Sequence, residues 1–139
     1  MDKKIQQNGY IPSEKESFMN PQQMDFFRQK LLIWREDILR DSRDTLENLQ
    51  QENVVHADVA DRASSESDRT LELRTRDRQR KLISKIDAAL RRIDEGTYGY
   101  CEDSGEPIGV ARLIARPVAT LSLEAQEKHE RREKVYRDD

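Results

Sequence analysis

The stretch MDFFRQKLLIWREDI, residues 24–38, decides the fold of this chain of 139 residues. Its large apolar residues recur at steps of three, four, three and four, and they are Met24, Phe27, Leu31, Trp34 and Ile38. This is the heptad spacing of a helix that buries one apolar seam against a partner helix. Just upstream, Asn20 and Pro21 predict a helix start, because Asn caps a first turn well and Pro loses no hydrogen bond there.

A second apolar seam lies in TLELRTRDRQRKLISKIDAALRRIDEG, residues 70–96. Its members repeat at steps of four, three and four, and they are Leu82, Ile86, Ala89 and Ile93. Gly96 is a natural helix stop. The first seam thins at Asp41 and Thr45, and a polar, acidic break then separates the two helices. Two such helices predict an antiparallel coiled-coil hairpin, on the order of 45 Å long, with a polar tip near residues 53–65.

The whole chain is predicted to be mainly α and to have three parts. Residues 1–19 are polar and aperiodic, which indicates a flexible N-terminal lead, unless contact with the rest of the chain orders it. Residues 20–96 form the hairpin. Residues 97–139 contain turn signals and then a charged helical pattern, which predicts a small globular knuckle followed by a C-terminal helix.

Composition excludes several classes of function. Charged residues make up 38% of the chain and the net charge is −3, whereas a dedicated DNA-binding domain is usually basic. We therefore expect no direct sequence-specific binding of DNA. No apolar run approaches the roughly 20 residues of a membrane span, and the N-terminus lacks the apolar segment of a signal peptide. One cysteine forms no intramolecular disulfide, so the expected location is the reducing cytoplasm, with no membrane association.

The stretch YGYCEDSGEPIG, residues 98–109, is half of a zinc knuckle by pattern, but a serine, Ser104, stands where the second cysteine belongs. A structural zinc site needs four ligands, mostly Cys or His. The chain offers Cys101, with His56 in the predicted tip and His129 on the last helix, so zinc is not expected. Cys101 is then either a small packed residue or a redox-sensitive thiol, and the latter requires exposure and a lowered pKa.

Five separated blocks carry a family resemblance: FRQKLLIWREDI, DVADRAS, LELRTRDRQRKLISKI, YGYCEDSGEPIGVARLIARP and the terminal helix. In this order and spacing they resemble the DksA/TraR family of RNA polymerase-binding transcription factors, over about residues 18–136. The resemblance implies a long coiled-coil hairpin on a small globular base, and a regulator that is not an enzyme. It also implies a monomer whose hairpin enters the secondary channel of RNA polymerase. There the tip would act near the active site, together with guanosine tetraphosphate, to destabilise promoter complexes such as those at ribosomal RNA promoters.

The chain departs from the family at the four zinc-ligand positions. These map to Cys101, Ser104, Ser122 and Ala125, so three of the four ligands are lost. The resemblance therefore implies a degenerate, zinc-independent knuckle that is held by packing. The candidate packing residues are Tyr98, Tyr100, Ile108, Leu113 and Leu121, each of which could contribute roughly 1.5–3 kcal/mol when buried.

The predicted tip contains two carboxylates three residues apart, Asp58 and Asp61, which share one side of a helical turn. Asp58 could instead simply cap the second helix. The resemblance assigns these two residues and Ala63 to regulation rather than docking.

The second helix carries a basic stripe at steps of four, three and four, formed by Arg74, Arg78, Lys81 and Lys85. It is either a solvated face paired with acids of the other arm or a docking surface for an acidic partner. The resemblance implies that Arg78 contributes to polymerase binding, with Arg74 and Lys81 beside it.

Binding of the tetraphosphate requires clustered cations. The matching family positions are Lys85, Arg116 and Gln126. The first two keep their charge, whereas Gln126 replaces a lysine, and nearby Lys128 is a candidate substitute.

Two other classes of function compete with this interpretation. A structural coiled-coil adaptor would use the hairpin as a dimerisation rod, but a rod would keep its seam apolar throughout. A metal-dependent phosphohydrolase could use Asp58 and Asp61, but further clustered ligands and a Gly-rich phosphate loop are missing from the sequence.

Overall fold

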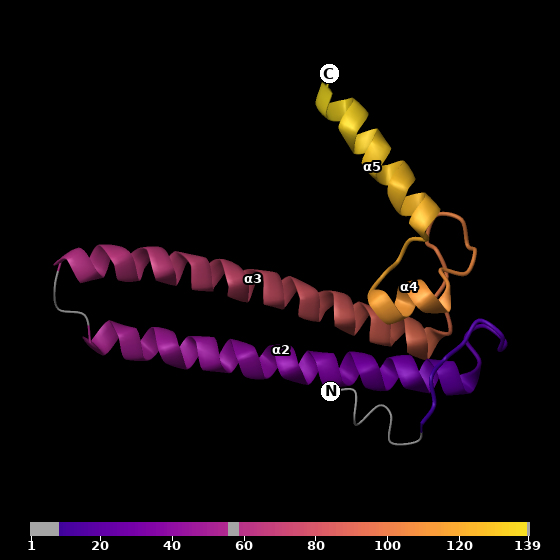
Figure 1. Cartoon of the computed structure of the whole chain (residues 1–139), viewed down its shortest axis with the longest axis horizontal. Coiled ribbons are helices and arrows are strands. Elements are labelled where there is room, and N and C mark those ends of the chain that lie inside the picture. The colour runs from indigo at the N-terminus through magenta and orange to yellow at the C-terminus, as the bar shows by residue number, and fades with distance from the viewer. Residues whose placement is uncertain (1–8, 56–58, 139) are drawn as a thin grey trace. The chain divides into compact units, whose positions relative to one another are not determined.

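A computed structural model describes residues 9–55 and 59–138; the side chains of Leu49 and of residues 51–65 and 136–138 are outside that description. The described elements are helices, as Figure 1 shows. They are α2 (Pro21–Val55), α3 (Val59–Glu95), α4 (Val110–Ala115) and α5 (Leu123–Asp138). The prediction of a mainly α fold is confirmed.

The chain divides into two compact units. The base combines the segment up to Leu32 with the segment from Ile86 onward, and the arms span Ile33–Lys85. Within the arms, α2 and α3 run side by side in opposite directions (Figure 1), which is the predicted antiparallel hairpin. The predicted boundaries at residues 20 and 96 differ from this division, because the base also includes the ends of both long helices, near the knuckle.

Both predicted helix boundaries near the base are confirmed by their hydrogen bonds. The side chain of Asn20 accepts a bond from the backbone N–H of Gln23 at 2.9 Å, which is an N-cap. Gly96 has a φ of 80°, and the N–H of Thr97 reaches back to the carbonyl of Arg92 at 2.9 Å. This is the pattern of a helix that ends at a left-handed glycine.

The expected break near the tip is shorter than predicted. α2 continues to Val55 and α3 begins at Val59, so most of the stretch over residues 53–65 is helical. The prediction took this polar, acidic stretch as a break, whereas Asp and Ser are also favoured at helix starts. None of the helices within the described ranges carries an apolar run that would span a bilayer.

The core of the base forms where the ends of α2 and α3 meet the knuckle. Phe27 and Leu31 of α2 and Ile86 of α3 are fully buried, as their positions in the two seams predict. Tyr98 is also fully buried; its ring lies 5.7 Å from that of Phe27, centroid to centroid, and its hydroxyl donates to the carbonyl of Pro117 at 2.7 Å. Burial of such large side chains stabilises the base by roughly 1.5–3 kcal/mol each.

The segment before α2 is held by contacts from Tyr10 onward, where the Tyr10 ring meets that of Phe26, so residues 10–19 are ordered by contact with the rest of the base. The fully buried amide of Gln23 donates to the carbonyl of Ser13 at 3.1 Å and accepts from the N–H of Met19 at 2.8 Å. Met19 lies directly on Gly99, where an added Cβ would come within 3.0 Å of its side chain. A polar sequence without periodicity gave no sign of these long-range contacts.

The seam in the arms shifts by one residue relative to the prediction. Ile38 is buried, but Asp41 is exposed and Ser42 takes the inner position. The hydroxyl of Ser42 donates to the side-chain carbonyl of Gln79 on α3 at 2.7 Å. The step from Ile38 to Ser42 is four residues where a strict heptad has three, which locally unwinds a coiled coil.

Candidate functional site

The knuckle is a tight loop closed by its own backbone. Tyr100 and Pro107 form an isolated antiparallel bridge. The N–H of Cys101 donates to the carbonyl of Glu106 at 2.8 Å, and the carbonyl of Cys101 accepts from Gly105 at 2.8 Å. Gly105 has a φ of 72°, a conformation that side chains disfavour. The loop therefore keeps the shape of a metal knuckle through hydrogen bonds of its own.

The positions where the family resemblance implies lost zinc ligands have other structural roles. Ser122 is the N-cap of α5: its hydroxyl accepts from the N–H of Ala125 at 3.2 Å, and its carbonyl from Gln126 at 2.9 Å. Ala125 is buried against the base. The hydroxyl of Ser104 accepts from the N–H of Glu106 at 3.3 Å and stabilises the turn. Ser122 thus serves as a helix cap and Ser104 as a turn residue.

These residues do not fit a structural zinc ion. A closed zinc site needs four ligating atoms, usually thiolates or imidazoles, at about 2.0–2.3 Å. Cys101 supplies one thiolate, Ser104 and Ser122 supply hydroxyls that already accept backbone bonds, and Ala125 supplies a methyl group. Within the described ranges, no three Cys, His, Asp or Glu side chains lie close enough together to hold a metal.

Cys101 combines burial with an acidic thiol. It is 3% exposed. Burial by itself raises its pKa, but hydrogen bonds from the Ser104 hydroxyl and from backbone groups of Ser122, Ser104 and Asp103 outweigh that effect and lower the pKa to about 6. The packed-residue interpretation is supported by the burial. Of the two properties that a redox-sensitive thiol requires, Cys101 has the lowered pKa but not the exposure.

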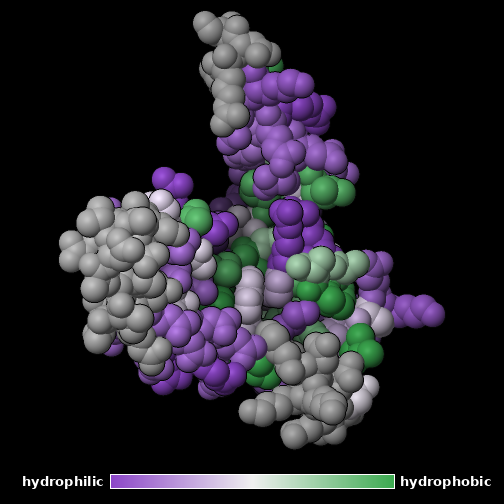
Figure 2. All heavy atoms as spheres, turned by 60° about the vertical axis from the view of Figure 1, so that its left-hand side comes forward, coloured by the Kyte–Doolittle hydropathy of each residue, from purple (hydrophilic) through white to green (hydrophobic). Residues whose placement is uncertain are grey.

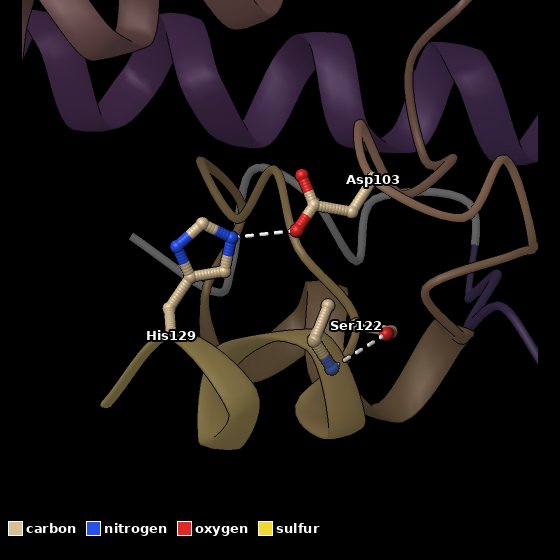
Figure 3. A network of polar contacts seen from close by, with 4 residues as sticks. Asp103, Ser122 and His129 are labelled. Carbon is tan, nitrogen blue, oxygen red and sulfur yellow. Dashed lines mark hydrogen bonds and ion pairs between the residues drawn. The ribbon is translucent and has the colours of Figure 1, made fainter. Parts of the chain in front are cut away.

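Direct contacts connect the knuckle to the start of α5. The N–H of Glu102 donates to the carbonyl of Thr120 at 2.9 Å. The guanidinium of Arg112 on α4 donates to the carbonyl of Leu121 at 3.0 Å. His129, in the second turn of α5, faces Asp103 of the loop with 2.5 Å between Nε2 and Oδ2 (Figure 3). Together these contacts join the knuckle loop to the start of α5. In a four-cysteine zinc finger, the metal ligands would join these two segments.

A groove of about 550 Å³ lies beside the knuckle. Ser104, Ser122 and Ala125 are on its wall, together with charged residues of both signs from α5, among them Glu127 and Lys128. Beyond this groove, hydrophilic side chains cover nearly all of α5 on the face that Figure 2 shows. The mixture of charges favours no single class of ligand there.

The basic stripe is exposed, and no described side chain of the opposite arm neutralises it. Arg74, Arg78, Lys81 and Lys85 all face solvent. Two ion pairs of the described arms lie within one helix: Arg40 with Asp37 at 3.6 Å and Arg80 with Asp77 at 3.9 Å. Arg78 itself bonds the Thr75 hydroxyl of its own helix at 3.4 Å. Among the described residues, none of the four stripe cations forms an ion pair with the opposite arm.

Sequence reasoning missed one member of this surface. Leu71 is 60% exposed and precedes Arg74 by three residues, so it extends the stripe towards the tip with an apolar side chain. Leu71 continues the alternating steps of three and four residues that define the stripe, so the sequence spacing could have identified it.

The other predicted site residues lie in different parts of the chain. Asp58 is outside the described residues, and Asp61 and Ala63 fall in the first turns of α3, with side chains outside the description. Lys85 belongs to the arms, whereas Arg116 and Gln126 belong to the base. Arg116 is exposed directly after α4, and the Gln126 amide donates to Glu130 at 3.2 Å.

Comparison with known families gives two matches that together cover most of the chain. Residues 23–93 match the family model "DnaK suppressor protein DksA, N-terminal domain". Residues 96–131 match the model "Prokaryotic dksA/traR C4-type zinc finger". The second match includes the positions of Cys101, Ser104, Ser122 and Ala125, although three of the four cysteines of that finger are absent.

Individual relatives agree with these family models. The chain is 67% identical to the RNA polymerase-binding transcription factor DksA of Caulobacter vibrioides, over 97% of this chain and 95% of that one. It is 44% identical to the protein of the same name from Escherichia coli, over 86% and 79% of the two chains. The solved structure of transcription factor DksA2 from Pseudomonas aeruginosa superposes with a TM-score of 0.80 at 41% identity, over 88% and 93% of the two chains.

The acidic thiol generates a testable pH dependence. Because the pKa of Cys101 is about 6 in the folded chain and about 8.5 in an unfolded one, unfolding between these pH values takes up a proton. The free energy of unfolding should therefore fall as the pH is lowered through this window. Thiolate absorbance of the folded protein should titrate with a midpoint of about 6. A Ser104→Ala variant should titrate at higher pH, and an unchanged midpoint in this variant would contradict the assignment.

Proposed function

Because the chain belongs to the DksA family, we propose that it is a transcription regulator that binds RNA polymerase, and that it is not an enzyme. The observation that carries this proposal is the basic stripe of α3. Four exposed cations at helical spacing, unpaired with the other arm in the described structure, form a surface that suits an acidic partner. An internal role for these cations would have left them in ion pairs between the arms.

We infer that the hairpin enters the secondary channel of the polymerase and presents its tip near the active site. An antiparallel pair of helices suits that role, since it is only two helices wide and Val59–Lys85 alone spans about 40 Å. Asp58, Asp61 and Ala63 are proposed to act at the tip by destabilising promoter complexes, including those of ribosomal RNA promoters. They act on the polymerase and catalyse nothing themselves.

Guanosine tetraphosphate is the proposed co-regulator, bound at the polymerase interface by Lys85, Arg116 and Gln126. Exposure of Lys85 and Arg116 supports this assignment, because both cations are available to phosphate groups. Gln126 contributes no charge and already bonds Glu130, so its contribution is the weakest of the three.

The knuckle is proposed to fold without zinc. Support comes from the N-cap of Ser122, the turn bond of Ser104 and the contact between Asp103 and His129, which together connect the segments that a metal would join. Removal of three thiolates is compensated by backbone hydrogen bonds and by packing around Tyr98.

A monomer in the cytoplasm, where the polymerase is found, completes the proposal. The structural adaptor remains the alternative, and one observation separates the two. The seam contains Ser42 and Gln79 where a dimerisation rod would have apolar residues, so the arms are poorly suited to a structural role alone.

Transcription in vitro from a ribosomal RNA promoter tests the tip and the stripe separately. Asp58→Asn combined with Asp61→Asn should keep polymerase binding and lose inhibition, because the docking surface is intact. Arg78→Ala should instead weaken binding by about 1 kcal/mol or more, through loss of a charged contact. Glu66→Gln, an exposed change on the same helix, is the matched control. Normal inhibition by the tip variant would reject the tip model.

The alarmone assignment is tested by a dose response in the same assay. Lys85→Ala and Arg116→Ala should each shift the half-effective concentration of guanosine tetraphosphate upward several-fold, since each removes a charge-assisted phosphate contact. Gln126→Lys should shift it downward by restoring a cation. Dose responses that coincide for all three variants would contradict this site.

Zinc independence is tested on the purified protein. Elemental analysis should find far less than one zinc per chain, and a chelator should leave both the melting temperature and the inhibition of transcription unchanged, because folding does not depend on metal bonds. Stoichiometric zinc, or melting that a chelator lowers, would overturn the proposal.

A further inference from the structure

The inner face of the hairpin changes from apolar to polar side chains along the arms. Ile38 is buried, but from Ser42 and Gln79 towards the tip the inner positions of the described side chains are polar. On α3 these positions continue the heptad steps of four and three from Gln79, through Thr75 to Glu72, each partly buried. The arms therefore have an apolar zone and, beyond Ser42, a polar zone.

The hydroxyls in the polar zone form few bonds between the arms. Ser42 donates across to Gln79. Thr45, however, donates to the carbonyl of Asp41 at 2.9 Å, and Thr75 donates to the carbonyl of Leu71 at 3.0 Å, so both bonds stay within one helix. Such bonds satisfy the hydroxyl without attaching one arm to the other.

Glu72 weakens this zone further. Its Oε2 atom is buried and has no hydrogen-bond donor among the described residues. A buried polar atom without a partner is destabilising, because it has lost its water without replacement. The leucines on either side, Leu71 and Leu73, are 60% and 51% exposed, so they contribute little burial in compensation.

We propose that the arms separate locally beyond Ser42 and Gln79 while the apolar zone stays closed. Opening would return water to the Glu72 carboxylate at the cost of few contacts, so it needs less free energy than separation at Ile38. The described end of α3 that carries Asp61 and Ala63 can therefore move more easily than the apolar zone. This property would let the tip adjust to a partner while the base and the apolar zone hold their shape.

Hydrogen–deuterium exchange on the full-length protein tests this proposal. Amides of residues 66–75 should exchange faster than those of residues 81–85 of the same helix. Fraying from the tip would give the same gradient, so the decisive sample is Glu72→Leu. Removal of the unpaired carboxylate should slow exchange across residues 66–75 about tenfold.

Glu66→Leu is the matched control. Glu66 is exposed on the same helix, and the change removes the same charge and adds the same helix-forming residue, so any difference reports burial. Circular dichroism checks that both variants are folded. Unchanged exchange in Glu72→Leu, or equal slowing in Glu66→Leu, would overturn the proposal. The experiment needs no polymerase, so its failure is distinct from a failure of the proposed function.

Discussion

The base depends on the contact between Tyr98 and the ends of the long helices. The buried ring packs on Phe27, and the hydroxyl bonds the carbonyl of Pro117. Burial raises the pKa of this phenol, so the hydroxyl stays a donor. One side chain thereby joins α2, the knuckle and the segment before α5. Gly99 next to it leaves space for Met19, and so the N-terminal segment depends on the same corner.

Short-range hydrogen bonds of two serines stabilise the knuckle and the start of α5. Serine is a poor zinc ligand, but it is among the best N-caps and a good turn residue. At position 122 it caps α5, and at position 104 it stabilises the loop and bonds the Cys101 thiol. Both serines therefore stabilise the stretch that matches the zinc-finger family model.

The inner face of the arms is more polar than the stability of a long hairpin would favour. A long hairpin is most stable with an apolar seam throughout, yet the described structure has Ser42, Gln79 and an unpaired carboxylate of Glu72 on its inner face. Stability is concentrated instead in the base, where Phe27, Leu31 and Ile86 are fully buried. Among the described residues, large apolar side chains are fully buried in the base, whereas the inner face of the arms beyond Ser42 is polar.

Local pattern alone determined the two long helices, their N-cap at Asn20 and their stop at Gly96, because apolar periodicity and capping are properties of neighbouring residues. It also identified the basic stripe, since helical spacing alone puts Arg74, Arg78 and Lys81 on one face. Only the tertiary structure decided that these cations lack ion-pair partners among the described residues of the opposite arm, that Ser42 rather than Asp41 lies inside, and that residues 10–19 pack on the base. These outcomes depend on contacts between segments distant in sequence, whose register and burial no local pattern specifies.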